Sequence, residues 1–327
     1  MRQTKKSLRE FYRGNFSKLA MLLTAATLIS CFPARSLAQD KGEKTFSSAE
    51  EASQALYKGA KANDQAALLD VLGPEGKQII SSGNTAEDAE RRANFATRFE
   101  QMHRLVKEPD GSTTLIIGVE NWPLPIPILE KNGAWYFDTE KGKELILFRR
   151  IGHNELSAIT ICKQLVEAQK EYYSQEGREY AQKISSDEGK KNGLYWAKTG
   201  SEPESPIGPL VAEASIGGKK EVSQPQPFHG YYFRILTRQG KDAPGGAENY
   251  IVGGKMTAGF AIEAFPAEYR NSGVMTIVVN KDGAMYQKDL GKKTESAAKG
   301  LKAFNPDQSW SKVEEQTEQT ATSQKPQ

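Results

Sequence analysis

The apolar positions of residues 46–106 recur at helical spacing. After Phe46, a Ser-Ser-Ala-Glu-Glu run has the pattern of a capping box, so a helix is predicted to begin at Ser47 or Ser48. A second helix is predicted to restart at Asn63–Asp64 and to stop at Gly73–Pro74. A third is predicted to end before Pro109, with these residues on one face: Phe95, Phe99, Met102 and Val106.

From Ser112 onward the period changes from 3.6 to 2, which is typical of strands. Strands are predicted over Ser112–Glu120, Trp122–Glu130 and Ala134–Asp138, with Asn132-Gly133 as the tight turn between the last two. Three prolines remove alternate N–H groups from one side of the second strand, which predicts an edge strand. The prolines are Pro123, Pro125 and Pro127, and the amides left to pair with Ala134–Asp138 are those of Leu124, Ile126 and Ile128.

Three helices followed by a hairpin-connected sheet predict a small α+β domain over residues 46–152. Its order of elements resembles that of the cone-shaped NTF2-like and cystatin-like folds. A further helix through Leu145, Leu147 and Phe148 is predicted to end at Gly152, where we place the domain boundary.

The second half predicts a long helix across an antiparallel meander, again α+β, over residues 153–310. The helix runs from Asn154 to about Tyr173, with one apolar stripe and with Lys163, Glu167 and Lys170 toward water. Strands are expected at His229–Leu236, Met256–Phe265, Val274–Asn280 and Ala284–Lys288, and short helices at Pro209–Ala214 and Thr294–Phe304. The sheet face expected to cover the helix consists of Tyr231, Phe233 and Ile235, then Phe260, Ile262 and Ala264, then Val274, Thr276 and Val278.

Charge is distributed unevenly along the chain of 327 residues. Residues 1–38 hold seven basic residues against one acidic residue, a net of +6, whereas the whole chain has +3, so the remainder carries −3. The basic character therefore belongs to the first segment, and we expect no nucleic-acid partner. A Gln-, Glu- and Thr-rich stretch at residues 311–327 is expected to be a disordered tail.

The first 38 residues have the three parts of a secretory signal peptide: a basic start, an apolar run over Leu19–Phe32 and a small-residue exit. Cleavage after Ala38 would leave a chain that begins at Gln39, with a polar lead over residues 39–45. Leu-Ile-Ser-Cys also resembles a bacterial lipobox, in which Cys31 would become the lipidated first residue. Both routes predict export to the periplasm or beyond, with a lipid anchor in the second and no transmembrane span in the mature chain.

Motifs that carry chemistry are few. Cys162 lies in an apolar stretch of the predicted long helix and is expected to be a buried structural cysteine. His103, His153 and His229 are far apart with no metal-ligand spacing, and neither a nucleophile elbow nor a nucleotide-binding glycine motif is present. The sequence therefore predicts no catalytic, cofactor or metal site, although it leaves convergence of the histidines in space open.

Aromatic residues gather around His229 in the second half. We expect most of them to pack in the core, and the alternative is a recognition surface on loops. The residues of that alternative surface are Tyr195, Trp196, His229, Tyr231, Pro244 and Gly245.

Several runs of the second half together resemble a known bacterial family. They are Gly193–Trp196, Ser205–Leu210, His229–Leu236, Ala243–Ala247, Gly254–Phe260 and Phe304–Asp307. In these runs, and over about Phe46 to Trp310, the chain resembles the exported family known as domain of unknown function 2950. That resemblance implies an exported protein and implies no activity or site residues. The order of elements after Gly152 is also similar to the globular part of type IV pilins and pseudopilins, although the long helix here is internal.

The sequence favours a non-enzymatic protein that binds or scaffolds at the bacterial envelope, with an envelope protein or polymer as its partner. The alternative is an enzyme or small-ligand binder with a pocket in the first domain. Its walls would be Phe95, Phe99, Trp122 and Trp135, with His103 as the acid or base.

Overall fold

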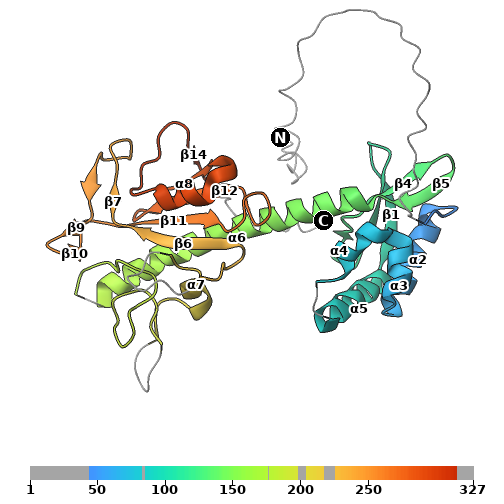
Figure 1. The fold of residues 1–327 in the computed structure, drawn as a ribbon, viewed down its shortest axis with the longest axis horizontal. Coiled ribbons are helices and arrows are strands. Elements are labelled where there is room, and N and C mark those ends of the chain that lie inside the picture. The colour runs from blue at the N-terminus through green and yellow to red at the C-terminus, as the bar shows by residue number, and fades with distance from the viewer. Residues whose placement is uncertain (1–43, 83–84, 176, 198–203, 217–224, 315–327) are drawn as a thin grey trace, which may run out of the picture. The chain divides into compact units, whose positions relative to one another are not determined.

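The computed structural model describes residues 44–82, 85–175, 177–197, 204–216 and 225–314, and within them the chain is an α+β protein (Figure 1). Its helices are α2 (Ala49–Lys61), α3 (Gln65–Leu72), α4 (Lys77–Ile80), α5 (Thr85–Gln101), α6 (Thr139–Gln175), α7 (Pro209–Glu213) and α8 (Thr294–Gly300), with 3-10 turns η1 (Pro74–Gly76) and η2 (Gly291–Lys293). No described helix has both the length and the apolar character needed to cross a bilayer.

Strands β1–β5 form what we name the amino-terminal sheet, in the order β1-β2-β4-β5 with β3 paired to β2 and every pair antiparallel. Its strands are β1 (His103–Lys107), β2 (Thr113–Ile117), β3 (Trp122–Pro123), β4 (Ile128–Lys131) and β5 (Ala134–Phe137). Helices α2, α3 and α5 supply the apolar residues that pack with this sheet, among them Leu56, Leu68 and Phe99.

The local signals of this region are confirmed. The Ser48 hydroxyl accepts a hydrogen bond from the Glu51 N–H at the start of α2, and the Asp64 carboxylate accepts one from the Ala67 N–H at the start of α3. Asn132 and Gly133 both have positive φ, 56° and 78°, in the turn that joins β4 to β5. Each signal lies within a few residues of the element that it specifies.

The prediction that the third helix extends through Val106 is wrong. Helix α5 ends at Gln101, and residues His103–Lys107 form β1 instead. The Glu108 N–H donates to the Ser112 carbonyl at 2.8 Å, which closes a hairpin with β2. Pairing with β2 therefore overrides the helical spacing at this end.

The predicted edge strand Trp122–Glu130 is also wrong in two respects. It is divided into β3 and β4, with bends between them, and β4 is interior because Ile128 pairs with both Thr113 and Phe137. The Leu124 N–H donates to the Leu115 carbonyl of β2 at 2.7 Å, not to β5. The prolines thus interrupt the strand, so that β3 pairs with β2 and β4 pairs with both β2 and β5. Of the predicted pairing, only that between β4 and β5 is confirmed.

Helix α6 is continuous over 37 residues, so the predicted stop at Gly152 and new start at Asn154 are wrong. Asn154 does not cap a helix: its Nδ2 donates to the Ser272 carbonyl at 2.8 Å. Glu155 Oε1 accepts the N–H groups of Val274 and Met275. Gly152 does not end the helix, because a glycine inside a helix lowers helix stability by only about 1 kcal/mol. Asn154 and Glu155 bond to a distant segment instead of capping a new helix.

The carboxy-terminal sheet has the order β14-β13-β12-β11-β6 and is antiparallel throughout. Its strands are β6 (Tyr231–Leu236), β11 (Ala261–Pro266), β12 (Met275–Asn280), β13 (Met285–Asp289) and β14 (Ser311–Lys312). Two-residue strands beside it form the pairs β7 (Arg238–Gln239) with β8 (Glu248–Asn249) and β9 (Ile251–Val252) with β10 (Lys255–Met256).

Both faces of this sheet are covered, by α6 on one side and α8 on the other (Figure 1). Every residue of β11 is consequently buried. The sheet residues that face α6 are those predicted on β6 and, on β11, Ile262 and Ala264. On β12 the prediction is wrong. Ala264 pairs with Ile277 and Ile262 with Val279, so Ile277 and Val279 share the α6 face, while Thr276 and Val278 lie on the α8 face.

Three predicted elements of this half are shorter than expected. The first strand begins at Tyr231 because His229 and Gly230 form a turn. The strand expected over Met256–Phe265 is interrupted between β10 and β11, and α8 ends at Gly300, after which Phe304 pairs with Gln239. The tail predicted to be disordered over residues 311–327 is wrong at its start, because Ser311–Lys312 form β14 and pair with β13. From residue 315 onward it lies outside the described residues.

Candidate functional site

The residues proposed as a recognition surface divide between core and surface. Tyr231 is fully buried and its hydroxyl donates to the Met275 carbonyl at 2.9 Å, so burial raises the pKa of this phenol. Trp196 is also buried, with the Lys191 ammonium 5.7 Å from its ring centroid. Tyr195 is half-buried and pairs through its N–H with the Ile184 carbonyl. Tyr231 and Trp196 belong to the core and Tyr195 lies at its edge. They therefore do not form one exposed surface with His229, Pro244 and Gly245.

Pro244 and Gly245 are exposed in a loop whose shape is fixed by the Gln239 side chain. The Gln239 amide donates to the Pro244 and Gly246 carbonyls, and its oxygen accepts the Tyr250 hydroxyl at 2.8 Å. Partial burial raises the pKa of Tyr250 to about 12, so this phenol keeps its proton at neutral pH. The Gln239 amide thus braces the loop, together with the hydrogen bond from the Gly246 N–H to the Ala243 carbonyl at 2.9 Å.

The residues proposed for an amino-terminal pocket do not surround a common space. Phe99 is buried with Leu115 and Ile117, and its ring stacks on those of Tyr57 and His103 at centroid distances of 4.6 and 3.9 Å. Trp122 instead lies under the Arg149 guanidinium at 5.4 Å.

Phe95 and Trp135, the other two walls of that pocket, pack as partly buried residues against the α2–α3 core. His103 Nδ1 lies 2.9 Å from the Phe99 carbonyl and its Nε2 lies 3.8 Å from Glu50 Oε1. The four aromatic side chains thus pack against different neighbours, and His103 contacts Phe99 and Glu50.

Cys162 is completely buried on the sheet-facing side of α6, in the core of the carboxy-terminal sheet. Desolvation raises the pKa of its thiol well above the ordinary value, so the sulfur stays protonated. A thiol in this state packs as a small apolar group. Among the described residues, no group of three or more His, Cys, Asp or Glu side chains is arranged to hold a metal ion.

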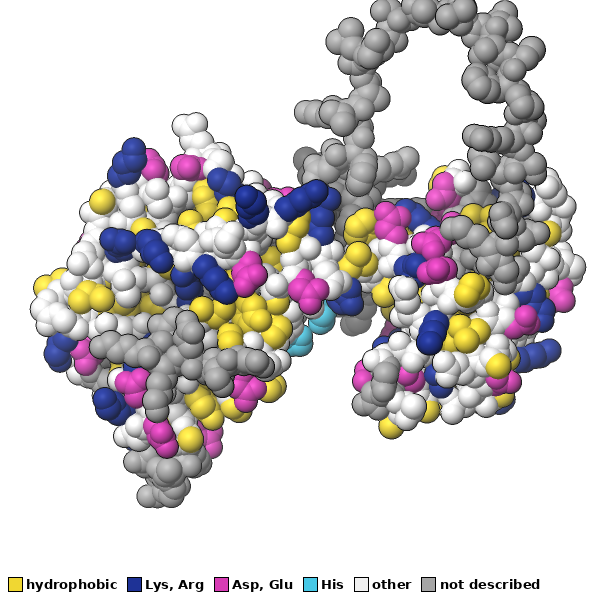
Figure 2. All heavy atoms as spheres, viewed as in Figure 1, with side chains coloured by type: hydrophobic (Ala, Val, Ile, Leu, Met, Phe, Trp, Pro, Cys, Tyr) yellow, Lys and Arg dark blue, Asp and Glu magenta, His cyan; other side chains and the backbone are white. Residues whose placement is uncertain are grey.

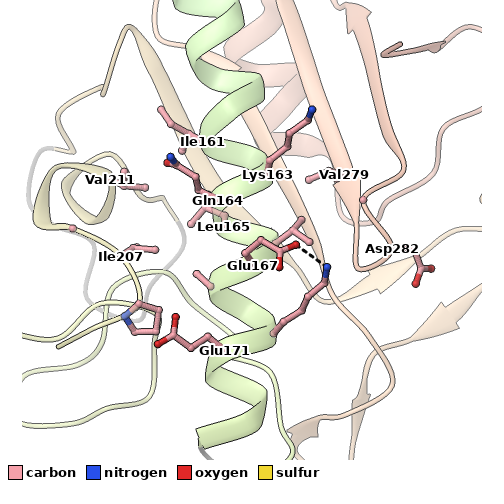
Figure 3. A pocket seen from close by; sticks show the side chains of 16 residues that line it. Ile161, Lys163, Gln164, Leu165, Glu167, Glu171, Ile207, Val211, Val279 and Asp282 are labelled. Carbon is pink, nitrogen blue, oxygen red and sulfur yellow. Dashed lines mark hydrogen bonds and ion pairs between the residues drawn. The ribbon is translucent and has the colours of Figure 1, made fainter. Parts of the chain in front are cut away.

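A groove of about 650 Å³ lies against α6, between the segments on either side of the helix (Figure 3). Three segments form it: the α6 turns from Ile161 to Glu171, the segment 206–211 that leads into α7, and the end of β12 with its turn at Asp282–Gly283. Figure 3 shows Ile207 and Val211 on one side of the helix and Val279 and Asp282 on the other. We name this feature the α6 groove.

The walls of the α6 groove are apolar and its rim is charged. Ile161, Leu165, Ile207 and Val211 are among the residues of the walls. On the rim, the Lys170 ammonium pairs with Glu167 Oε1 at 2.7 Å. The volume and this division of polar and apolar residues are those of sites that bind an apolar group and orient it by its polar neighbours.

Part of the charge on the rim is paired. Asp282 pairs with Lys281 at 2.9 Å, and that hydrogen bond raises the pKa of the lysine. Glu171 accepts a hydrogen bond from the Gln175 amide at 2.9 Å. These contacts leave the rim polar with both signs present, which suits the recognition of another polypeptide more than that of a strongly charged small molecule.

Sequence reasoning missed this groove. It placed Lys163, Glu167 and Lys170 on the water-facing side of the helix, which is correct, but it did not place the Ser-Pro-Ile-Gly-Pro-Leu run opposite them. The available signal was the predicted short helix at Pro209–Ala214, which α7 confirms. Ile207 and Val211 are apolar residues in and just before that helix, so the sequence predicts that another element packs against them.

Fold and groove together define an α+β protein with a groove of about 650 Å³ beside a long helix. The chain matches a family model described as Protein of unknown function (DUF2950) over residues 43–313. Because this match covers most of the 327 residues, the chain belongs to that family. No curated protein and no solved structure matches it. The likenesses to pilins and to NTF2-like folds accordingly stay predictions.

Proposed function

We propose that this protein is an exported bacterial envelope protein that binds a partner polypeptide through the α6 groove and does no chemistry on it. The observation that carries the proposal is the groove itself, with apolar walls contributed by α6 and by the segment 206–211. A binding surface of this kind needs an apolar centre and a polar rim, and both are present. The basic and apolar pattern of residues 1–38 supports the export part of the proposal.

The occupant that fits the groove is an apolar side chain or a short apolar helix turn of another protein. Ile207 and Val211 stand across the groove from the α6 residues, and each is only partly buried in the described structure. Covering them would remove apolar surface from water, which is the main favourable contribution to such association. An envelope polymer with many charges finds less to bind, because the Lys170–Glu167 and Lys281–Asp282 pairs already neutralise part of the rim charge.

The experiment compares two single variants of the same short helix. Val211→Asp places a carboxylate in the groove wall, whereas Leu210→Asp changes a neighbour that is 58% exposed and does not line the groove. Mature protein and both variants are used to capture partners from envelope fractions after crosslinking. We expect capture to be lost with Val211→Asp and kept with Leu210→Asp.

Two results would count against the groove. Equal capture by both variants would place the binding surface elsewhere, and equal loss would mean that unfolding of α7 caused the effect. Circular dichroism and thermal unfolding of each variant separate the second case from specific loss, because neither substitution is at a fully buried position.

Export is tested by sequencing the amino terminus of the protein recovered from its native host. A chain that begins at Gln39 supports the soluble route, and a lipid-modified Cys31 supports the anchored one. Both outcomes agree with an envelope protein. An intact Met1 on protein from the cytosol would contradict export.

We also propose that residues 46–152 and 153–310 are two domains. Residues from Phe46 to Phe137 and residues from Ala158 to Phe304 fall into separate apolar cores, which supports this division. The continuity of α6 requires the boundary to lie inside a helix. A chain from residue 139 to 314, which keeps the helix whole, is therefore expected to unfold cooperatively.

A further inference from the structure

Two of the three histidines come together although they are far apart in the sequence. His153 lies on α6 and His229 in the turn before β6, and their ring centroids are 5.9 Å apart with the planes at 80°. Both residues are exposed. Figure 2 shows imidazole side chains, in cyan, next to one another at the surface.

The two rings differ from that of His103 in what engages their nitrogens. His103 faces the Phe99 carbonyl with one nitrogen and Glu50 with the other. His153 and His229 contact each other, and the His229 ring also contacts that of Phe228 at a centroid distance of 4.3 Å. Neither histidine has a hydrogen bond or ion pair to another described residue in the structure. Their ring nitrogens are therefore available to a ligand within the described part of the chain.

The backbone holds both side chains in place. Phe228 and Tyr231 exchange two hydrogen bonds, at 3.0 and 3.1 Å, around His229 and Gly230, whose φ angles are 46° and 72°. This is a type I′ turn, which strongly favours Asn-Gly, so a histidine at its first central position is an unusual choice. The opposite histidine stands on the helix next to Asn154, which is bonded to the Ser272 carbonyl. A rigid helix and a tight turn pre-organise the pair.

We propose that His153 and His229 form a two-histidine site for a divalent transition-metal ion. A metal–nitrogen bond of about 2.1 Å puts an imidazole centroid about 3.2 Å from the ion, so two rings on a tetrahedral ion have centroids about 5 Å apart. The present separation of 5.9 Å exceeds that value by about 1 Å, so metal binding requires the two side chains to rotate until one nitrogen of each ring faces the ion. Neutral imidazole suits Cu²⁺, Ni²⁺ and Zn²⁺, and Cu²⁺ binds most tightly by the usual order of affinities.

With two protein ligands, the remaining coordination positions are filled by water or by a group from a partner molecule. Such a site is weaker than a structural zinc site with four protein ligands, so it exchanges its ion. It is independent of the α6 groove, because neither histidine lines that groove. The outcome of the groove experiment therefore does not decide the outcome of this one.

The test is a titration of the full mature chain, without an affinity tag, with Cu²⁺ and with Zn²⁺ by calorimetry. We expect the wild type to bind one ion more tightly than the variants do. His153→Gln and His229→Gln should each lower the affinity by at least about tenfold, which is about 1.4 kcal/mol. The matched control is His103→Gln, which should leave the affinity unchanged because its ring is engaged elsewhere.

A second variant separates metal binding from a merely structural ring contact. His229→Asn puts the preferred residue into the type I′ turn, so we expect it to fold with an unchanged or higher thermal midpoint while losing the ion. In Cu²⁺ spectra by electron paramagnetic resonance, the wild type should show coupling to two imidazole nitrogens. Full affinity in His229→Asn, or no coupled nitrogen in the wild type, would overturn the proposal.

Discussion

The two sheets of the protein differ in how they are covered, and this difference decides which sequence patterns are informative. In the amino-terminal sheet, β1 exposes His103, Arg104 and Lys107, so it carries polar residues. In the carboxy-terminal sheet, α6 and α8 cover opposite faces, and β11 has no exposed position. A strand that is buried on both faces loses its alternation of polar and apolar residues. It must then accommodate any charge that it contains inside the protein.

That charge is Glu263, which is completely buried in β11. Its carboxylate accepts a hydrogen bond from the Arg234 guanidinium, and Arg234 also donates to the Ala298 and Leu301 carbonyls at the end of α8. The other carboxylate oxygen, Oε1, has no hydrogen-bond partner among the described residues. One arginine thus joins the sheet to the helix that covers it, whereas charges of the amino-terminal sheet lie in water.

The largest expected effect comes from Arg234→Met. Removing the guanidinium leaves Glu263 buried without its cation, and a broken buried pair costs about 3–5 kcal/mol of unfolding free energy. The matched control is Arg98→Met beside the amino-terminal sheet, where the exposed Arg98–Glu120 pair at 3.8 Å should be worth about 1 kcal/mol or less. Urea denaturation measures both, and equal losses in the two variants would remove the contrast between the sheets.

The pH dependence of stability sharpens the same contrast. Burial raises the pKa of Glu263 from 4.5 to about 7, against the opposing influence of Arg234. Between these values the folded chain holds a proton that the unfolded chain releases, so this carboxyl stabilises the fold most below pH 4.5. That stabilisation is lost as the pH rises toward 7, by about 1.4 kcal/mol per unit at most.

Glu263→Gln is the control for this prediction, since its amide oxygen still accepts from Arg234 while the titration is removed. Unfolding free energies measured in urea from pH 4.5 to 7 should fall less steeply in the variant than in the wild type. Parallel curves for the two proteins would show that Glu263 does not titrate in this range.

A smaller effect is expected from glycines of the two regions. In Gly273→Ala the new Cβ would lie 2.3 Å from the Tyr231 hydroxyl oxygen, and this buried tyrosine cannot move away freely. We expect a loss of about 1–3 kcal/mol, as for other overpacked cores. In Gly133→Ala the space is open and only the positive φ of 78° is unfavourable, at a cost of about 1 kcal/mol. Thermal unfolding ranks the two, and a larger loss in Gly133→Ala would contradict the crowding argument.

The smallest expected effect is a gain. Gly152→Ala should stabilise the protein by about 0.5–1 kcal/mol, because alanine is the better residue inside a continuous helix. Ala158→Gly, on the buried side of α6, is the comparison that should destabilise it. If Gly152→Ala were instead destabilising, the helix would need the freedom of a glycine at this point.

Local signals predicted local structure. Ser48 and Asp64 as caps and Asn132-Gly133 as a hairpin turn need only neighbours within a few residues, and each of these predictions is confirmed. The end of α5 and the interior position of β4 were not predictable in this way, since both depend on pairing with β2. The same holds for β12, because a strand buried on both faces shows no alternation of apolar and polar residues, and the buried Thr276 does not mark a water-facing side.

The candidate sites depend still more on distant segments. The α6 groove needs residues near positions 165, 207 and 282 to meet, and the histidine pair needs a helix and a turn from different parts of the chain. The residues themselves were visible in the sequence, but their proximity follows from the order of strands in the carboxy-terminal sheet. Nothing in the spacing of His153 and His229 encodes it.

The long helix also has a consequence for the order of events during folding. The apolar side of α6, from Ala158 to Tyr172, is covered by β6, β11 and β12, and the first of these strands begins at Tyr231, about sixty residues further along the chain. Helices form in about a microsecond, whereas contacts between segments so far apart form slowly. We therefore expect α6 to form before the sheet does, and its apolar side to stay exposed to water until the strands pack on it. During that interval the uncovered side is apolar surface exposed to water, which makes the partly folded chain prone to aggregation.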